Sequence, residues 1–376
     1  MKKILFYLLV GTSLIAQSCI NDNEDPVAVL PSNSIIADAN VGGPTQPNQV
    51  WVDLSDVTTV NGKEVPKETL TKRTDWDIAL YSGSSFKVAI NSSIMMAAGK
   101  IPNATDIDLV KDSDVTALKN QVQVANFNPS NVAYIDDVNG NFPTGSTAIG
   151  EVKTIDSDNA IYLVNMGKEL YTGSVPVGSV MTGGDSRGWM KVQVVRLADG
   201  YKVKYAELNA TSHKELIISK NAAYNFNFVS LKNNKEVFIQ PEKNKWDISF
   251  TVFTNTIDGA GSYVYADFVT TNIVGGAGSY EVKVAADVAA QTYNDFKASN
   301  VDASKFIYND QRSIGPNWRN PVGVNGLEVY GDRFYVLKDP AGNYFKLKFT
   351  RITKSKTDEN GVSGERGFPQ FEYKAL

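Results

Sequence analysis

A short motif around tryptophan occurs twice in the chain, and this internal repeat restricts the fold more than any other feature of the sequence. Residues 74–80, Thr-Asp-Trp-Asp-Ile-Ala-Leu, recur about 170 residues later as residues 244–250, Asn-Lys-Trp-Asp-Ile-Ser-Phe. An aromatic-bearing stretch precedes each motif, at residues 51–54 in the first copy and 226–228 in the second. Self-similarity at a fixed spacing indicates a duplicated structural unit. The sequence therefore predicts two divergent copies of one module.

The correspondence continues after the motif in three further pairs of segments, always in the same order. The pairs are residues 161–164 with 334–337, residues 190–194 with 345–349, and residues 201–205 with 371–374. The offset is near 170 residues for the outer pairs and about 155 for the middle pair, because the first copy holds a Gly- and Ser-rich run at residues 172–188. Extra residues of this kind are tolerated best in loops.

Apolar and polar residues alternate inside these segments. In residues 344–349 the phenylalanines and the leucine share one face, while Lys346 and Lys348 share the other. A period of two is typical of an antiparallel strand with one face in water. Helical periodicity is short and is confined to residues 113–121 and 285–297. The expected fold class is therefore all-β, mainly antiparallel, with minor short helices.

The first 18 residues have the features of a lipoprotein signal peptide. Lys2 and Lys3 precede an apolar stretch that ends at Ile15, is too short to span a bilayer as a mature helix, and is followed by small residues and Cys19. We expect cleavage before Cys19 and lipidation of its thiol. An ordinary secretory signal with an incidental cysteine stays open as the alternative.

Residues 19–45 are expected to form a flexible tether, and two β modules are expected at residues 46–219 and 220–376. The acidic run at residues 20–26 cannot bury enough apolar surface to fold. It resembles the export signal that sends lipoproteins of some Gram-negative bacteria to the outer face of the outer membrane, although a plain solvated linker is an equal alternative. We expect an outer-membrane protein that faces the cell exterior.

The charge of the chain argues against nucleic acid as a partner. The formal net charge is −4, and it becomes −6 when Lys2 and Lys3 leave with the signal. No basic stripe is present that could neutralise phosphates. No second apolar run reaches membrane-spanning length, so we expect membrane contact through the lipid alone. Since Cys19 is the only cysteine, the exported part is expected to depend on its core and not on disulfides.

The repeated motif has a structural interpretation of its own. Trp76 and Trp246 each sit in an alternating strand that would bury the indole, whose N–H then needs a hydrogen-bond partner. We expect Asp75, Asp77 and Asp247 to act as turn or strand-end acceptors and not as catalytic acids. No Ser/His/Asp set can be built around a single histidine, and no Cys/His zinc cluster occurs. We therefore do not expect an enzyme.

Several segments resemble the HmuY family. They are the Trp-Asp-Ile-Ala-Leu motif at residues 76–80, the hairpin at residues 335–349, the closing residues 371–374 and the Ile-Gly-Pro-Asn-Trp-Arg run at residues 314–319. The likeness occurs once per copy and is clearest from Tyr224 onward. HmuY proteins are all-β surface lipoproteins that capture haem without catalysis. The resemblance thus implies haem or a related tetrapyrrole as ligand, a role in iron acquisition, and an outer-membrane receptor as partner.

The resemblance also implies two axial iron ligands, His or Met, on loops between the motif and the last hairpin. Carried onto the second copy, the later ligand falls around Trp318 and the earlier one before it, and neither place offers His or Met. Our candidates for axial ligands are Met166, at an expected hairpin tip, and Met181, on the inserted loop, because loops can present thioether sulfur to iron. Beyond haem iron we expect no metal. The other donors, which are interpreted as linker, loop or core residues, are His213, Met95, Met96 and Met190.

Three hypotheses for function remain open. The first is a tandem HmuY-like protein that captures haem. The second is an HmuY fold that has lost haem ligation and serves as a binding or adhesion module for another ligand or partner. The third is a glycan-binding or glycan-acting protein with an open cleft, for which Trp318 and Arg319 would be the residues to inspect.

Overall fold

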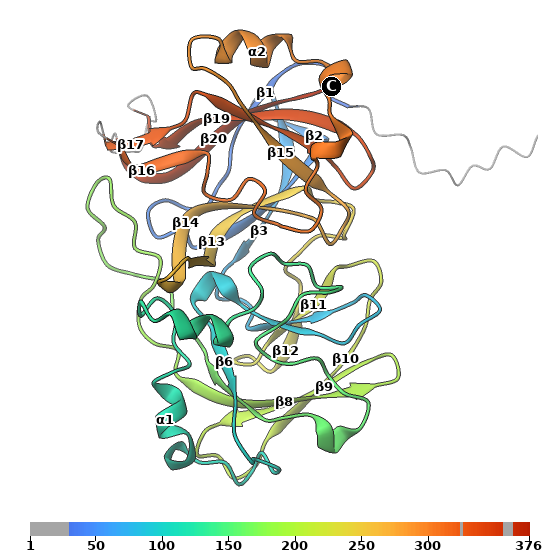
Figure 1. The fold of residues 1–376 in the computed structure, drawn as a ribbon, viewed down its shortest axis with the longest axis vertical. Coiled ribbons are helices and arrows are strands. Elements are labelled where there is room, and N and C mark those ends of the chain that lie inside the picture. Colours follow the sequence, from blue (N-terminus) through green and yellow to red (C-terminus); the bar gives the residue numbers. More distant parts are fainter. Residues whose placement is uncertain (1–29, 324–325, 356–363) are drawn as a thin grey trace, which may run out of the picture.

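The computed structural model describes residues 30–323, 326–355 and 364–376, and nearly all of its regular structure is antiparallel β-strand (Figure 1). The all-β fold class is therefore confirmed. The expected signal peptide and Cys19 lie outside the described residues. Within the described ranges, no helix is long and apolar enough to cross a membrane.

Eighteen of the strands form four sheets, which we call A to D, with strands given in spatial order. Sheet A consists of β1 (Ile35–Asp38), β20 (Arg366–Ala375), β19 (Tyr344–Thr353), β18 (Arg333–Lys338) and β15 (Gly278–Lys283). Sheet B consists of β14 (Gly261–Thr271), β13 (Ile248–Ile257), β2 (Asn48–Val60) and β3 (Lys63–Lys72). Sheet C consists of β12 (Lys235–Val237), β11 (Phe226–Ser230), β4 (Ile78–Tyr81) and β5 (Val88–Ile90). Sheet D consists of β10 (Lys214–Ser219), β9 (Gly200–Glu207), β8 (Trp189–Leu197), β7 (Tyr162–Asn165) and β6 (Ala97–Lys100). The other elements are the hairpin of β16 (Arg319–Gly323) and β17 (Gly326–Val329) and the helices α1 (Thr116–Lys119) and α2 (Ala289–Asp295).

The four sheets are layered in the order A, B, C, D along the long axis of the molecule (Figure 1). One apolar core fills the space between sheets A and B, where Phe250 stacks on Phe371 with ring centroids 5.4 Å apart. A second core, which includes Leu80 and Val203, lies between sheets C and D. A third, mainly aromatic cluster joins the inner sheets B and C. Because the inner sheets are covered on both faces, all four residues of β4 are buried.

Each strand that precedes a tryptophan motif pairs with the strand of the other motif. β2 precedes the first tryptophan motif but pairs with β13 of the second, with Ile248 opposite Val52. β11 precedes the second motif but pairs with β4 of the first, with Phe228 opposite Ala79. β1, which falls within the expected tether, pairs with the last strand β20. The division into modules at residue 219 stays a prediction. Strands before residue 219 pair with strands after it in sheets A, B and C, so neither module contains every strand of these sheets.

The aspartate of each motif accepts a backbone hydrogen bond from the strand that precedes the other motif or from the residue just after that strand. Asp77 Oδ2 accepts from the backbone N–H of Leu231 (2.7 Å), and Asp247 Oδ2 accepts from that of Leu54 (2.7 Å). The prediction that these carboxylates are turn or strand-end acceptors is therefore confirmed. Asp77 also forms an ion pair with Arg187 at 2.8 Å, with both side chains almost fully buried. The second copy offers Asp247 no such cation, and burial holds the pKa of its carboxyl well above the ordinary value.

The prediction that Lys346 on β19 faces water is wrong. Helix α2 covers this position, and Lys346 is only 4% exposed. Its Nζ donates to the carbonyl oxygens of Tyr293 (2.5 Å) and Asn294 (3.1 Å) near the end of that helix. The equivalent Lys191 on β8 is buried too and donates to the carbonyl oxygen of Val110 (2.7 Å). Each lysine thus holds a covering segment onto an outer sheet, and burial lowers the pKa of both.

Candidate ligand-binding site

A cavity of about 120 Å³ lies between the inner sheets B and C, where the two halves of the molecule meet. Its position follows from strand alternation. In β13, Ile248 and Phe250 point toward sheet A, so Ser249 and Thr251 point the other way, toward sheet C. The residues that line the cavity are Gln49, Trp51, Trp76, Ala79, Ala89, Ile90, Ser92, Met96, Ile135, Asp136, Asp137, Val138, Phe142, Phe226, Phe228, Gln240, Trp246, Ser249, Thr251, Phe253, Thr254, Thr270 and Gln311.

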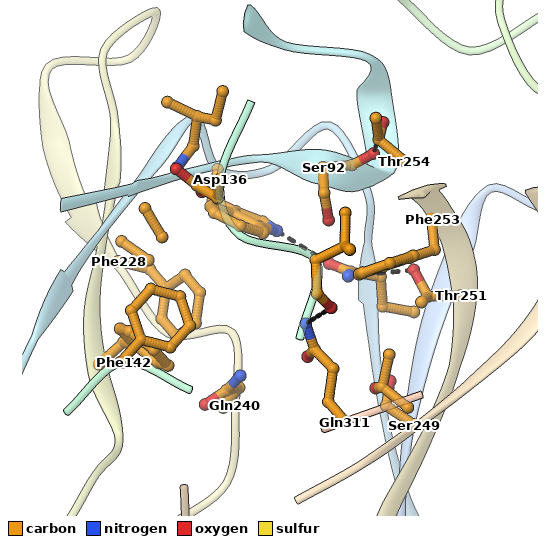
Figure 2. A pocket seen from close by; sticks show the side chains of 18 of the residues that line it. Ser92, Asp136, Phe142, Phe228, Gln240, Ser249, Thr251, Phe253, Thr254 and Gln311 are labelled. Carbon is orange, nitrogen blue, oxygen red and sulfur yellow. Dashed lines mark hydrogen bonds between the residues drawn. The ribbon is translucent and has the colours of Figure 1, made fainter. Parts of the chain in front are cut away.

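Aromatic rings from both sequence copies form much of the wall. Trp51 packs edge-on against Trp246 with ring centroids 4.8 Å apart, and Trp76 packs in the same way against Phe228 at 4.9 Å. Figure 2 shows Phe142 and Phe228 on one side of the cavity, Ser249 on the opposite side, and Gln240 between them. Edge-to-face packing holds aromatic rings in fixed orientations, so this wall is largely pre-formed.

A line of hydrogen bonds crosses the cavity wall from sheet C to sheet B. Trp76 Nε1 donates to Gln49 Oε1 (2.8 Å), and Gln49 Nε2 donates to Thr251 Oγ1 (3.2 Å). The hydroxyl of Thr251 donates in turn to the carbonyl oxygen of Val252 (2.9 Å). Figure 2 draws the bond that reaches Thr251. The first tryptophan of the repeat therefore has the N–H partner that the sequence led us to expect.

The indole N–H of the second tryptophan, Trp246, differs from that of Trp76 in its hydrogen bonding. Trp246 is 5% exposed, yet its Nε1 has no hydrogen-bond partner among the residues that the structure describes. Gln240 Oε1 and Ser249 Oγ line the same cavity and also lack partners, although both residues are buried. Buried polar groups without partners are costly and rare in folded proteins. The expectation of a bonded N–H is thus confirmed for Trp76 and wrong for Trp246, and three unpaired groups line the same cavity.

Two loops that come from different sequence copies meet at the edge of the cavity. Gln311 Nε2 donates to the carbonyl oxygen of Val138 (3.0 Å), and the backbone N–H of Gln311 donates to the carbonyl oxygen of Asn139 (2.8 Å). Arg312 Nη2 donates to Asn139 Oδ1 (2.6 Å). The cavity therefore has contributions from both copies in its loops as well as in its sheets.

The described residues that line the cavity include no Lys, Arg or His, and their only ionisable groups are two carboxylates. Asp136 accepts backbone N–H bonds from Ile90 (2.8 Å) and Ala148 (2.9 Å), and Asp137 accepts from Asn139 (3.0 Å). Burial raises the pKa of Asp136 to about 7, although the two backbone bonds oppose the shift. The cavity has nothing to neutralise an anion.

The predicted axial ligands lie elsewhere. Met166 is 1% exposed and belongs to the core between sheets C and D. Met181 is 39% exposed on its loop, where its backbone N–H donates to the carbonyl oxygen of Pro44 (3.0 Å). Neither side chain lines the cavity. Over the described ranges, no group of three or more His, Cys, Asp or Glu side chains is placed to hold a metal ion.

The remaining donors are also occupied or buried. His213 Nδ1 lies 2.9 Å from Asp108 Oδ1, and its Nε2 lies 3.5 Å from Glu215 Oε1, so carboxylates face both ring nitrogens. Met96 is the one sulfur on the cavity wall, and Met190 packs against the core of sheets C and D.

Trp318 and Arg319 do not form an open glycan cleft. Trp318 is 1% exposed, stacks on Phe349 with ring centroids 4.4 Å apart, and donates its N–H to the carbonyl oxygen of Asp267 (3.2 Å). Arg319 is buried as well and lies 3.8 Å from the Asp267 carboxylate. The interpretation of this pair as a cleft for sugars is wrong, because both side chains are part of the core around sheets A and B.

Comparison with known proteins places the chain in a family. The HmuY protein family model matches residues 45–373, a span that starts just before β2 and ends in β20. The chain belongs to the HmuY family. No curated protein matches it. The HmuY match is one span with residues in all four sheets, and so agrees with the family resemblance seen in the short motifs, whereas two tandem copies of the family stay a prediction.

Haem, the ligand implied by HmuY membership, does not fit this cavity. A haem needs axial donors and partners for its two propionates, whereas the wall offers one methionine, no histidine and no cation. The cavity is also well below the roughly 300–1,000 Å³ of pockets for drug-sized ligands. Sequence reasoning missed Gln240 and Ser249 here. The available signal was that Ser249 and Thr251 are polar positions that alternate with the apolar Ile248, Phe250 and Val252.

Proposed function

We propose that this HmuY-family protein is an exported, lipid-anchored surface protein that binds a small ligand other than haem in the cavity between sheets B and C, without catalysis. The leader that ends at Cys19 supports the lipid anchor. Family membership supports display at the cell surface, and the acidic run after Cys19 supports the outer face of the outer membrane.

One observation carries the choice of ligand site. Trp246 Nε1, Gln240 Oε1 and Ser249 Oγ are buried and unpaired, and all three face one aromatic cavity. A pre-formed, mostly apolar cavity with a few convergent polar groups is the usual form of a small-molecule site. The same wall lacks the donors that haem requires, which favours a different ligand.

A haemin titration tests this proposal. The chain from residue 20 onward contains every described residue and is titrated with haemin, oxidised and reduced, while the Soret and visible bands are recorded. We expect a broad spectrum that does not saturate. A sharp, saturable, low-spin six-coordinate spectrum would overturn the proposal.

Haem capture with Met166 and Met181 as axial ligands is the second candidate, supported by membership in the HmuY family. Two thioether ligands would give a six-coordinate iron. Met166→Leu and Met181→Leu remove the sulfur while nearly conserving volume, and Met190→Leu is the matched control. This candidate requires that the first two variants lose the six-coordinate spectrum while the control keeps it.

The lipid anchor has its own test. Metabolic labelling with radioactive palmitate should mark the full-length protein, and Cys19→Ser should abolish the label and release the protein from the membrane fraction. A labelled Cys19→Ser variant would contradict the assignment of Cys19 as the anchor.

A further inference from the structure

We infer that the cavity between sheets B and C binds a neutral, planar molecule of one or two fused rings that presents a hydrogen-bond acceptor to the Trp246 indole N–H. This inference rests on the proposed function and deepens it by naming the chemistry of the ligand. Size, wall composition, charge and the unpaired groups each restrict that chemistry.

The size of the cavity limits the ligand to a small ring system. Its volume is about 120 Å³, and an apolar cavity of about 150 Å³ is known to take up benzene, so a single ring fills it. The cavity is partly open to solvent, so a second fused ring would extend beyond it. Three tryptophans, Trp51, Trp76 and Trp246, line it together with phenylalanines from β11 and from the loop at Phe142. Rings pack against rings with favourable edge and face contacts, so a flat molecule fits such a wall better than a branched aliphatic one.

The charges around the cavity select a neutral molecule. No cation lines it, and the carboxylates of Asp136 and Asp137 would repel an anion. Both oxygens of Asp136 already accept backbone N–H bonds, and Asp137 accepts one from Asn139. A cationic heterocycle with every ring nitrogen protonated has no acceptor for the Trp246 N–H, so a neutral ligand is favoured.

The unpaired groups give the polar pattern of the ligand. Trp246 Nε1 can only donate, so the ligand must supply an acceptor there. Gln240 Oε1 accepts, and the Ser249 hydroxyl can do either, so a ligand donor can be satisfied as well. The equivalent Trp76 is bonded to Gln49 and is closed to a ligand. Of the two repeated tryptophans, Trp76 thus has a structural hydrogen bond, whereas the Trp246 N–H is available to a ligand.

Three small probes of similar size test the inference by isothermal titration calorimetry on the chain from residue 20 onward at pH 8. Benzimidazole is neutral there and carries both an acceptor and a donor. Indene has nearly the same shape without either group, and benzoate carries a negative charge. We expect saturable one-to-one binding of benzimidazole, roughly tenfold weaker binding of indene, and no binding of benzoate.

Trp246→Phe removes the N–H and keeps an aromatic ring, so it should abolish the preference for benzimidazole over indene. Trp189→Phe, outside the cavity, is the matched control and should leave both affinities unchanged. Circular dichroism of each variant checks that the fold is intact, and the wild-type comparison of benzimidazole with indene does not depend on any variant.

The outcomes separate this inference from the proposed function. Equal binding of benzimidazole and indene, or binding of benzoate, overturns the inference while leaving a small-molecule site in place. If no probe binds and haemin gives no six-coordinate spectrum, the cavity holds only water and the inference is wrong. A six-coordinate haemin spectrum overturns the proposed function itself.

Discussion

The two tryptophans of the repeat are predicted to respond differently to the same substitution. Trp76 and Trp246 occupy equivalent positions, are 7% and 5% exposed, and line the same cavity. Trp76→Phe removes a donor that is bonded to Gln49 Oε1 at 2.8 Å, whereas Trp246→Phe removes a donor that has no partner. Both variants lose the same ring atoms, so the cost of the smaller ring largely cancels in the comparison.

The magnitude of the difference follows from the acceptor left behind. In Trp76→Phe, Gln49 Oε1 stays buried without its donor, and a buried polar group deprived of its partner costs about 1–3 kcal/mol. In Trp246→Phe no acceptor is stranded, and the loss of an unsatisfied N–H offsets part of the packing cost. We therefore expect Trp76→Phe to lower the free energy of unfolding by about 1–3 kcal/mol more than Trp246→Phe does.

Urea unfolding followed by far-ultraviolet circular dichroism measures both variants without using tryptophan fluorescence, which the substitutions change. The urea dependence of the unfolding free energy must agree between the variants for the comparison to hold. Equal destabilisation by the two substitutions would refute the reasoning, because it would mean that the Trp246 N–H has a partner of equal strength in the ligand-free protein.

Three further predictions concern the rest of the fold. Arg187→Met should lower the free energy of unfolding by about 3–5 kcal/mol, since it leaves the carboxylate of Asp77 buried without its cation, and the double variant with Asp77→Asn should recover part of the loss in urea melts. Burial raises the pKa of Glu68 to about 7, so between about pH 4.5 and 7 the folded state holds a proton that the unfolded state has released. The free energy of unfolding should therefore fall by up to about 3 kcal/mol as the pH rises from 4.5 to 7. Glu68→Gln should flatten this slope in melts across pH, and an unchanged slope would contradict the assignment. Residues 220–376 alone should stay unfolded by circular dichroism because they lack β1, β2 and β3, and adding a peptide of residues 30–75 should restore structure; autonomous folding would disprove the need for exchange.

Alternation in the sequence predicted about half of the strands and the hairpin at residues 335–349, but not the pairs between distant strands. Val52 on one face of β2 packs in the core shared with sheet A, and Trp51 on the other face packs in the aromatic cluster. The alternation contains no information on which strand lies alongside, so β2 would look the same beside β4 as beside β13. For this reason, the hydrophobic pattern of the sequence could not predict the exchange of strands between the two motifs.

The same limit applies to the site. The Trp-Asp-Ile motifs are almost identical locally, and what separates Trp76 from Trp246 is a glutamine on a different strand, Gln49. Lys346 shows the converse error. Its position in the alternation correctly indicated a polar face, but whether water or a helix covers that face depends on tertiary packing.

The exchanged strands also affect how the protein can evolve. In most duplicated proteins one copy is free to decay or to be deleted, because the other still forms a complete unit. Here β2 completes a sheet of the second copy and β11 completes a sheet of the first, so deleting either copy would leave two unfinished sandwiches. The segments before and after residue 219 therefore depend on each other to fold, and substitutions in either one alter the same cavity.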